Sequence, residues 1–367
     1  MPAAASLISL ASGYGHFATP ALVAARVAEL LRQRGPLPTS PTEGLPELRA
    51  ALAARYHSRG APAVTPADVV VTPGAKAALW AVLTAVLRPG DEVLLPTPNW
   101  FGFEELVVRA GGVLRPLPLC PADGYALRPE AVAAALTPRT RLLLFTNPCN
   151  PTGRIYTRTE MAALLHVTSR HPGLWVLADE IYDGICFGPE PVPTLLSFAD
   201  PHGQHVVVSG FSKSLALAGW GVGYLVAPPG VVRAATAAQF ATSGAAAVPS
   251  QLAALAATEA AAEISAGLCQ QLRPNRQRLL DFLQNLPTAL LHAPAGTYYA
   301  FPDLRPFLHP ALPPAAASTQ LTERLHAAGV AVVDGATCGS PGFVRLSYAV
   351  PEADLLEALR RLQQELR

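Results

Sequence analysis

The strongest constraint on the fold is an alternation of short apolar runs with longer helical stretches over the first two thirds of the chain. Helical periodicity occupies intervals between the runs, for example at residues 45–59 and 159–170. Strands separated by helices favour an α/β fold, with a mostly parallel sheet that helices cover on both faces. The strand-like runs lie at residues 68–72, 92–96, 113–119, 141–146, 174–179, 205–209 and 222–227.

The C-terminal third follows a different pattern. A long helix is expected over about residues 262–286, and two strand-like stretches follow at 295–301 and 343–348. Residues 352–367 form an amphipathic helical pattern. This part of the chain therefore indicates a second, smaller α/β domain.

The use of basic residues singles out one position. The chain has two lysines against 25 arginines, and Lys213 follows the apolar run 206–208 in Ser209-Gly-Phe-Ser-Lys213. A guanidinium group stays protonated and cannot form an imine, so this composition should keep an amine only where arginine cannot replace it. Lys213 is thus a candidate Schiff-base lysine, although an isolated Ser-Lys pair is more often a solvated lysine at a strand end.

Other polar groups also follow apolar runs. Asp179 ends the run that begins at Val176, with Tyr182 close behind, and Asn150 lies in Asn147-Pro-Cys-Asn150-Pro-Thr-Gly153 after the run 142–145. Open α/β sheets bind ligands at these carboxyl ends of strands. Taken singly, Asp179 would equally suit a helix N-cap, and Asn150 an ordinary turn.

A possible anion site precedes the helix expected to run to about Leu87. Thr72-Pro-Gly74-Ala75-Lys76 has the pattern of a strand, a glycine turn and a helix start. A helix start presents free N–H groups and the positive end of its dipole, so Gly74, Ala75 and Lys76 can bind a phosphate. Lys76, the second lysine, adds charge. An ordinary strand-to-helix turn has the same pattern.

These motifs, together with Gly219-Trp-Gly221-Val-Gly223-Tyr and Phe343-Val-Arg345-Leu-Ser-Tyr348, resemble the class I and II aminotransferases over about residues 7–348. The resemblance implies the fold of pyridoxal-phosphate-dependent transferases (fold type I). It implies a large domain at 39–264 with a mostly parallel seven-stranded sheet, and a small α/β domain at 1–38 and 265–367. A homodimer is also implied.

The resemblance further implies pyridoxal 5'-phosphate as the cofactor and a set of site residues. Asp179 would pair with the ring nitrogen, Tyr182 and Asn150 would bind the phenolic oxygen, and Arg345 would bind the substrate α-carboxylate. The full set is catalytic Lys213, Asp179 and Tyr182, cofactor-binding Gly74, Ala75, Lys76, Trp100, Asn150, Asp179, Tyr182 and Lys213, and substrate-binding Gly13, Asn150 and Arg345.

The chain departs from the family pattern at the phosphate. Gly221 stands where the family usually has a phosphate-pairing arginine, and Thr39 stands where a tyrosine usually reaches across the dimer. The stretch 13–17 also differs from the usual Gly-Glu-Pro-Asp-Phe. Loss of a charge-assisted hydrogen bond costs about 1.5–3 kcal/mol. We therefore expect weak cofactor retention unless another cation, such as Lys76 or an arginine from elsewhere, fills the gap.

The implied activity is transfer of an amino group from an L-amino acid to a 2-oxo acid. Two alternatives stay open: another reaction of the same cofactor, such as β-elimination, cyclisation or oxidation, and a non-catalytic aminotransferase-like protein. A nicotinamide site at Gly219-x-Gly221-x-Gly223 is disfavoured, because these glycines lead into the apolar run 222–227 and a Rossmann fingerprint should open a helix.

The composition of the chain argues against several other classes of protein. A formal net charge of +1 gives no basic field for nucleic acid. The five cysteines lack Cys-x-x-Cys spacing, so neither a zinc site nor a disulfide framework is expected. Residues 1–15 lack the basic start of a signal peptide, and no run of 18 residues is apolar enough for a membrane span. We expect a cytoplasmic enzyme.

Overall fold

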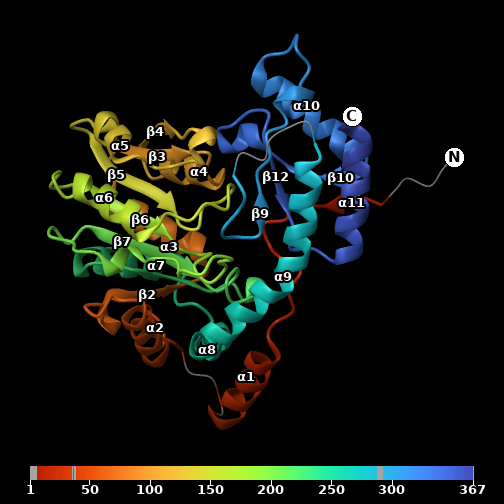
Figure 1. Cartoon of the computed structure of the whole chain (residues 1–367). Helices are drawn as coiled ribbons and strands as arrows, with labels where there is room; N and C mark the ends of the chain where they lie inside the picture. Colours follow the sequence, from red (N-terminus) through yellow and green to blue (C-terminus); the bar gives the residue numbers. More distant parts are fainter. Residues whose placement is uncertain (1–5, 35, 37–38, 287–291, 367) are drawn as a thin grey trace.

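The computed structural model describes residues 6–34, 36, 39–286 and 292–366 and is built around a seven-stranded sheet (Figure 1). Only β8 runs antiparallel to its neighbours, so the predicted mostly parallel sheet is confirmed. The seven predicted strands agree with the observed ones to within one residue at each end. In sheet order the strands are β2 (Val69–Thr72), β8 (Gly223–Val226), β7 (His205–Gly210), β6 (Trp175–Asp179), β5 (Thr140–Thr146), β3 (Glu92–Thr97) and β4 (Val113–Pro118).

Helices cover both faces of this sheet, which explains why its strands are continuously apolar rather than alternating. In β5, Leu143 and Phe145 belong to one core, whereas Leu142 and Leu144 belong to the core on the opposite face. One face packs against α3 (Ala75–Val86) and α7 (Pro229–Thr242), with α4 (Gly102–Arg109) beside them. The other face packs against α2 (Pro46–Ser58), α5 (Pro129–Ala135), α6 (Arg158–Thr168) and α8 (Val248–Glu259).

The C-terminal part begins with the long helix α9 (Ala261–Gln284), close to the predicted 262–286. A three-stranded antiparallel sheet has the order β11 (Val333–Asp334), β12 (Val344–Ser347), β9 (Tyr299–Ala300). The helices α10 (Pro314–Ala327) and α11 (Glu352–Glu365) pack around it, as Figure 1 shows. Among the described residues there are also six short 3-10 helices: η1 (Pro66–Asp68), η2 (Pro121–Asp123), η3 (Leu195–Ser197), η4 (Ala218–Trp220), η5 (Arg305–Phe307) and η6 (Gly335–Cys338).

The N-terminal residues reach both parts of the molecule. Strand β1 (Ile8–Ser9) pairs in parallel with β10 (Val330–Ala331), and α1 (Ala21–Arg34) packs against α8. The domain boundaries at 38/39 and 264/265 stay a prediction, and residues 1–5, 35, 37 and 38 of the first segment lie outside the described residues.

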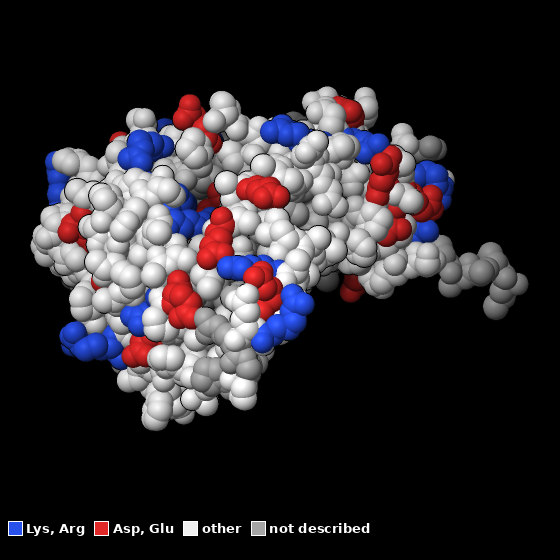
Figure 2. All heavy atoms as spheres, turned by 90° about the horizontal axis from the view of Figure 1, so that it is seen from below, with Lys and Arg blue, Asp and Glu red and all other residues white. Residues whose placement is uncertain are grey.

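Two surface properties bear on function. On the face seen in Figure 2, basic and acidic side chains are interspersed. Within the described part of the chain, no single helix is long and apolar enough to cross a membrane; α8 and α9 pass that test only as a pair, and they meet at a bend of 81°.

Candidate active site

The carboxyl ends of β5, β6 and β7 open on a cavity of about 460 Å³. Residues from the start of the chain, from the seven-stranded sheet and from β12 meet there. All ten residues that the sequence singled out line this cavity: Gly13, Gly74, Ala75, Lys76, Trp100, Asn150, Asp179, Tyr182, Lys213 and Arg345. The structure therefore brings the whole predicted set together, whereas their individual roles stay predictions.

Lys213 follows β7 and is held in the cavity by the N-terminal segment. Its Nζ donates a hydrogen bond of 2.6 Å to the Gly13 carbonyl and lies 3.7 Å from the ring centroid of Tyr14. Burial, reinforced by the nearby Arg345 charge, lowers the pKa of Lys213 to about 7, although Asp179 opposes the shift. At neutral pH a large share of the amine is therefore unprotonated and nucleophilic.

Asp179 is the last residue of β6 and is buried. The residues after it form a turn rather than a helix, so Asp179 is not a helix N-cap, although its Oδ1 accepts a hydrogen bond of 3.1 Å from the Ile181 N–H. Burial raises the pKa of Asp179 to about 7, although the hydrogen bond from the Ile181 N–H and the charge of Lys213 both act to lower it. A protonated ring nitrogen in the cavity would stabilise its ionised form.

Arg345 lies on β12 and is 3% exposed. Its Nη1 donates to Asn150 Oδ1 at 3.1 Å, its Nη2 donates to the Ala11 carbonyl at 2.8 Å, and its Cζ lies 4.3 Å from the ring centroid of Tyr299. Its buried Nε has no hydrogen-bond partner. Buried N–H groups are rarely left unpaired, so a donor at the edge of a cavity suits an acceptor on a ligand, such as a carboxylate.

Two tyrosines that the sequence did not assign, Tyr298 and Tyr299, contact Gly13. The hydroxyls of Tyr298 and Tyr299 donate to its carbonyl at 2.8 and 3.0 Å, and the hydroxyls of Tyr182 and Tyr299 lie 2.9 Å apart. Neighbouring residues of a regular strand point to opposite faces. A regular strand would therefore bring only one of Tyr298 and Tyr299 to the site. The strand begins only at Tyr299, so the sequence carried no clear signal for both.

The opposite end of the cavity is the start of α3. Gly74 has φ of +88°, and no side chain caps the helix, so the first backbone N–H groups face the cavity side. Gly223 allows β8 to approach this turn, because a Cβ there would lie 2.4 Å from the Ala75 nitrogen. This arrangement suits an anion.

The two departures from the family pattern are visible at this end. Gly221 lines the cavity, and a Cβ at this position would have no atom within 4 Å, so the place of the expected arginine is open space. Thr39 is exposed and is not among the residues that line the cavity. The Lys76 side chain points to the Trp100 ring, with its Nζ 5.4 Å from the ring centroid.

The residues present fit pyridoxal phosphate. Lys213 supplies an amine with a lowered pKa, and Asp179 supplies a buried carboxylate for a ring nitrogen. Trp100 supplies an aromatic face, and Gly74 begins the anion-binding helix start. The orphaned Nε of Arg345 remains for a substrate carboxylate.

Comparisons with known proteins agree with this geometry. The family model described as aminotransferase class I and II matches residues 5–362. A probable aspartate/prephenate aminotransferase of Thermus aquaticus is 35% identical over 98% of this chain and 91% of its own length. An aspartate aminotransferase of Streptomyces avermitilis is also 35% identical, over 98% of this chain and 89% of its own. The structure of the Thermus thermophilus aspartate aminotransferase with maleate superposes with a TM-score of 0.90 at 33% identity, covering 98% of this chain and 92% of that one.

Proposed function

Because this chain belongs to the class I and II aminotransferases, we propose that its amino donor is a dicarboxylic L-amino acid such as aspartate. The chain is a pyridoxal-phosphate-dependent aminotransferase of fold type I, which moves an amino group from an amino acid to a 2-oxo acid. The relatives named above are aspartate or aspartate/prephenate aminotransferases, which supports a donor with a second carboxylate.

The observation that carries this proposal is the pair of cations beside the reacting amine. Arg345 and Lys76 both line the cavity, and the charges of both lower the pKa of Lys213. Lys76 belongs to the first turn of α3 and lines the same cavity as Lys213, so its long side chain could reach a substrate side chain there. Arg345 would bind the α-carboxylate, and Lys76 would bind the distal carboxylate.

The chain's own residues divide the reaction between them. The bound cofactor supplies an electron sink for the charge that develops on the substrate α-carbon. Lys213 Nζ takes the proton from that carbon as general base. Asp179 would hold the ring nitrogen in its protonated form, and the Tyr182 and Asn150 side chains would bind the phenolic oxygen. Arg345 orients the substrate so that its α-hydrogen faces Lys213.

The test is a single half-reaction. Purified protein loaded with cofactor is mixed with an excess of L-aspartate in the absence of any 2-oxo acid, and the visible spectrum and released oxaloacetate are measured. We expect one equivalent of oxaloacetate per site and a slower reaction with L-alanine. Equal rates for the two amino acids would contradict the dicarboxylic donor, and release of a different product would contradict amino transfer.

We also propose a homodimer and a cytoplasmic location. Tyr14 and Phe101 line the cavity while they are 56% and 47% exposed, so a second copy would cover apolar surface next to the site. All five cysteines are free, which suits a reducing compartment. Light scattering of the loaded protein tests the dimer.

We propose that residues 39–264 form the large domain and that residues 1–38 and 265–367 form the small one. The pairing of β1 with β10 supports assigning the start of the chain to the small domain. Because α1 packs against α8, this segment also contacts residues that we assign to the large domain. Limited proteolysis near residue 264 would test the boundary.

A further inference from the structure

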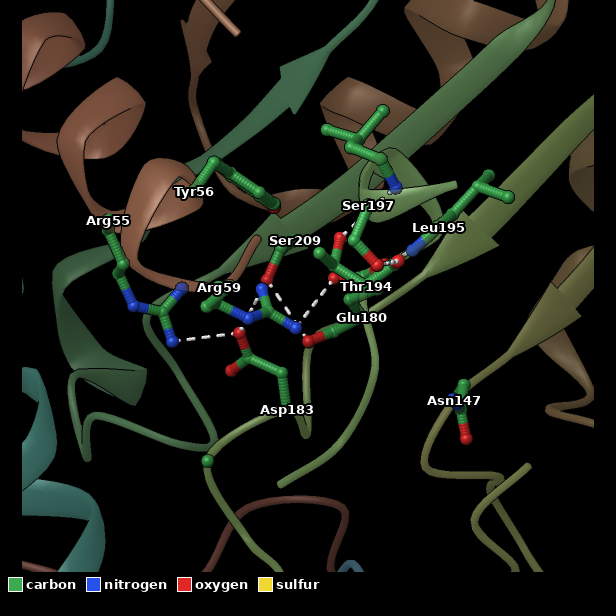
Figure 3. Close-up of polar contacts among 12 residues, drawn as sticks. Arg55, Tyr56, Arg59, Asn147, Glu180, Asp183, Thr194, Leu195, Ser197 and Ser209 are labelled. Atoms are coloured by element: carbon green, nitrogen blue, oxygen red, sulfur yellow. Dashed lines mark hydrogen bonds and ion pairs between the residues drawn. The ribbon is translucent and has the colours of Figure 1, made fainter. Parts of the chain in front are cut away.

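A buried cluster of charged residues lies against the turn that carries Asp179 and Tyr182. Its four members are Arg55 from α2, Arg59 directly after the end of α2, and Glu180 and Asp183 from the turn after β6; we call it the arginine–carboxylate cluster. Figure 3 shows the two arginines directed at the two carboxylates. None of the four lines the cavity, and the mechanism above uses none of them.

Arg59 contacts both acidic residues at once. Its Nη2 lies 3.0 Å from Glu180 Oε2, and its Nη1 lies 2.9 Å from Asp183 Oδ2. Arg55 adds a second contact to Asp183 Oδ2 at 2.8 Å. The side chains of Glu180 and Asp183 are only 1% and 3% exposed. The planar guanidinium of Arg59 therefore connects two buried carboxylates that belong to one turn.

The other oxygen of Glu180 is also anchored. Glu180 Oε1 accepts hydrogen bonds from Thr194 Oγ1 at 2.9 Å and from the Leu195 N–H at 2.8 Å, as seen beside the cluster in Figure 3. The Glu180 N–H donates to the Val208 carbonyl on β7 at 2.8 Å. The carboxylate is thus held from two sides, with Arg59 on one of them.

The turn presents its residues in two directions. Asp179 and Tyr182 line the cavity, whereas Glu180 and Asp183 reach the arginines. Because the four residues share one short backbone segment, a shift of the anchored pair also shifts the pair in the cavity.

The same turn is tied to the lysine. Ser214, the residue after Lys213, donates from its Oγ to the Ile181 carbonyl at 3.1 Å and accepts from the Gly184 N–H at 3.0 Å. The position of the turn therefore fixes Asp179 and Tyr182 relative to Lys213.

Stability alone does not explain such a cluster. Buried ion pairs are often no more stabilising than apolar side chains of similar size, because removing the charges from water is costly. Burial by itself would raise the pKa of Asp183, but Arg55 and Arg59 outweigh it and keep the pKa below the ordinary value. Asp183 thus stays ionised. Burial raises the pKa of Glu180 against the opposing charge of Arg59, and the two ion pairs of Arg59 hold both carboxylates at one place on the turn.

We propose that Arg59 is a positioning residue for amino transfer, because its bridge between Glu180 and Asp183 fixes the turn that presents Asp179 and Tyr182 to the cofactor. The inference rests on the roles proposed above for those two residues. Lysine cannot replace Arg59, since an ammonium group lacks the planar fork that spans two carboxylates.

The test compares Arg59→Lys and Arg59→Met with Arg109→Met as the matched control. Arg109 is exposed and pairs with the exposed Glu105, so its loss removes a surface ion pair only. Two properties are measured for each loaded protein: the pH midpoint of the visible cofactor band, and kcat and KM for L-aspartate. The pH midpoint can be measured without catalytic turnover.

We expect Arg59→Lys to lower kcat about 10- to 100-fold, the cost of a misplaced catalytic group. KM for L-aspartate should stay within about twofold, because Arg345 and Lys76 are untouched, and the pH midpoint should shift by at least about 0.5. The Arg109→Met protein should match the wild type. If Arg59→Met does not fold, Glu180→Gln, which keeps the size of the side chain, takes its place.

A folded Arg59→Lys protein with the wild-type pH midpoint and kcat would overturn the proposal, even if it were less stable. A wild-type protein that binds the cofactor but transfers no amino group would overturn the proposed function instead. The comparison of pH midpoints would then still decide whether Arg59 positions the turn.

Discussion

The two ends of the cavity are built in different ways. At the lysine end, the Gly13 carbonyl accepts from Lys213, Tyr298 and Tyr299, and Arg345 is hydrogen-bonded on two of its nitrogens. At the phosphate end, the start of α3 offers backbone N–H groups, and Gly221 leaves open space. The chain therefore fixes the reacting groups closely and leaves binding of the cofactor phosphate to a helix terminus.

The difference has an energetic consequence. A charge near a helix N-terminus gains about 0.3–2 kcal/mol. A charge-assisted hydrogen bond from an arginine would add about 1.5–3 kcal/mol. The rate of amino transfer should therefore be most sensitive to substitutions at the lysine end. The affinity for the cofactor should increase when the phosphate end gains a cation.

Lys213→Ala should have the largest effect. We expect amino transfer to fall by at least about 10³-fold, since both the nucleophilic amine and the general base are lost. The visible band of lysine-bound cofactor should disappear. Lys213→Arg is the matched control for charge, and it should be equally inactive because guanidinium forms no imine. Survival of the band in Lys213→Ala would show that another group holds the cofactor.

Arg345→Lys should come next. We expect kcat/KM to fall about 10²-fold for every amino acid donor, because an ammonium group cannot bind the α-carboxylate in the bidentate manner available to the fork. Steady-state rates with L-aspartate and L-alanine measure the effect. A loss confined to L-aspartate would assign Arg345 to the distal carboxylate instead.

Lys76→Met tests which residue binds the distal carboxylate of the donor and which binds the α-carboxylate. We expect kcat/KM for L-aspartate to fall about tenfold, the cost of one charge-assisted contact, with little change for L-alanine. The same two-substrate assay measures this. If cofactor affinity falls and the preference for L-aspartate does not, Lys76 serves the phosphate.

Gly221→Arg would make the two ends more alike. The new guanidinium should strengthen phosphate binding, but Gly221 has φ of +59°, a conformation that costs other residues about 1–2 kcal/mol. We expect a net gain of several-fold in cofactor affinity, on the order of 1 kcal/mol. Gly221→Gln has the same backbone cost without the charge. Equal affinities of the Arg and Gln variants would mean that another cation already fills the space.

The smallest effect concerns the stability of the cofactor-free protein. Burial lowers the pKa of Lys213 from 10.5 to about 7, so its cost to stability is absent above pH 10.5 and grows as the pH falls to 7. Lys213→Met should therefore be more stable than the wild type near pH 7, by at least about 1 kcal/mol, and equal to it near pH 10.5. Denaturant unfolding at both pH values measures this, and a destabilised variant at pH 7 would refute the buried neutral amine.

The sequence predicted best the features that depend on a single segment of the chain, such as the position of a strand. Strands such as 205–210 are covered on both faces and are therefore continuously apolar. The first and last apolar residues of such a run predict where the strand begins and ends. The motif residues Lys213, Asp179 and Arg345 could be grouped by a family resemblance and then met in one cavity.

Features that depend on distant contacts were not predictable. Arg59 has the pattern of an ordinary charged residue near the end of a helix, and only the fold places it between Glu180 and Asp183. The sequence also left Asp179 open between a carboxylate for the cofactor and a helix N-cap, and only the structure shows that a turn follows it. Tyr14 and Tyr298 contact Lys213 and Gly13 only because the N-terminal segment lies over the sheet.

The contrast between the two ends is tested most directly by titrating cofactor-free protein with pyridoxal phosphate and with pyridoxal, which lacks the phosphate. A phosphate held by a helix terminus alone should improve the dissociation constant by about 30-fold or less. A ratio of about 10⁴ or more would contradict the account, since it would mean that a cation such as Lys76 also binds the phosphate.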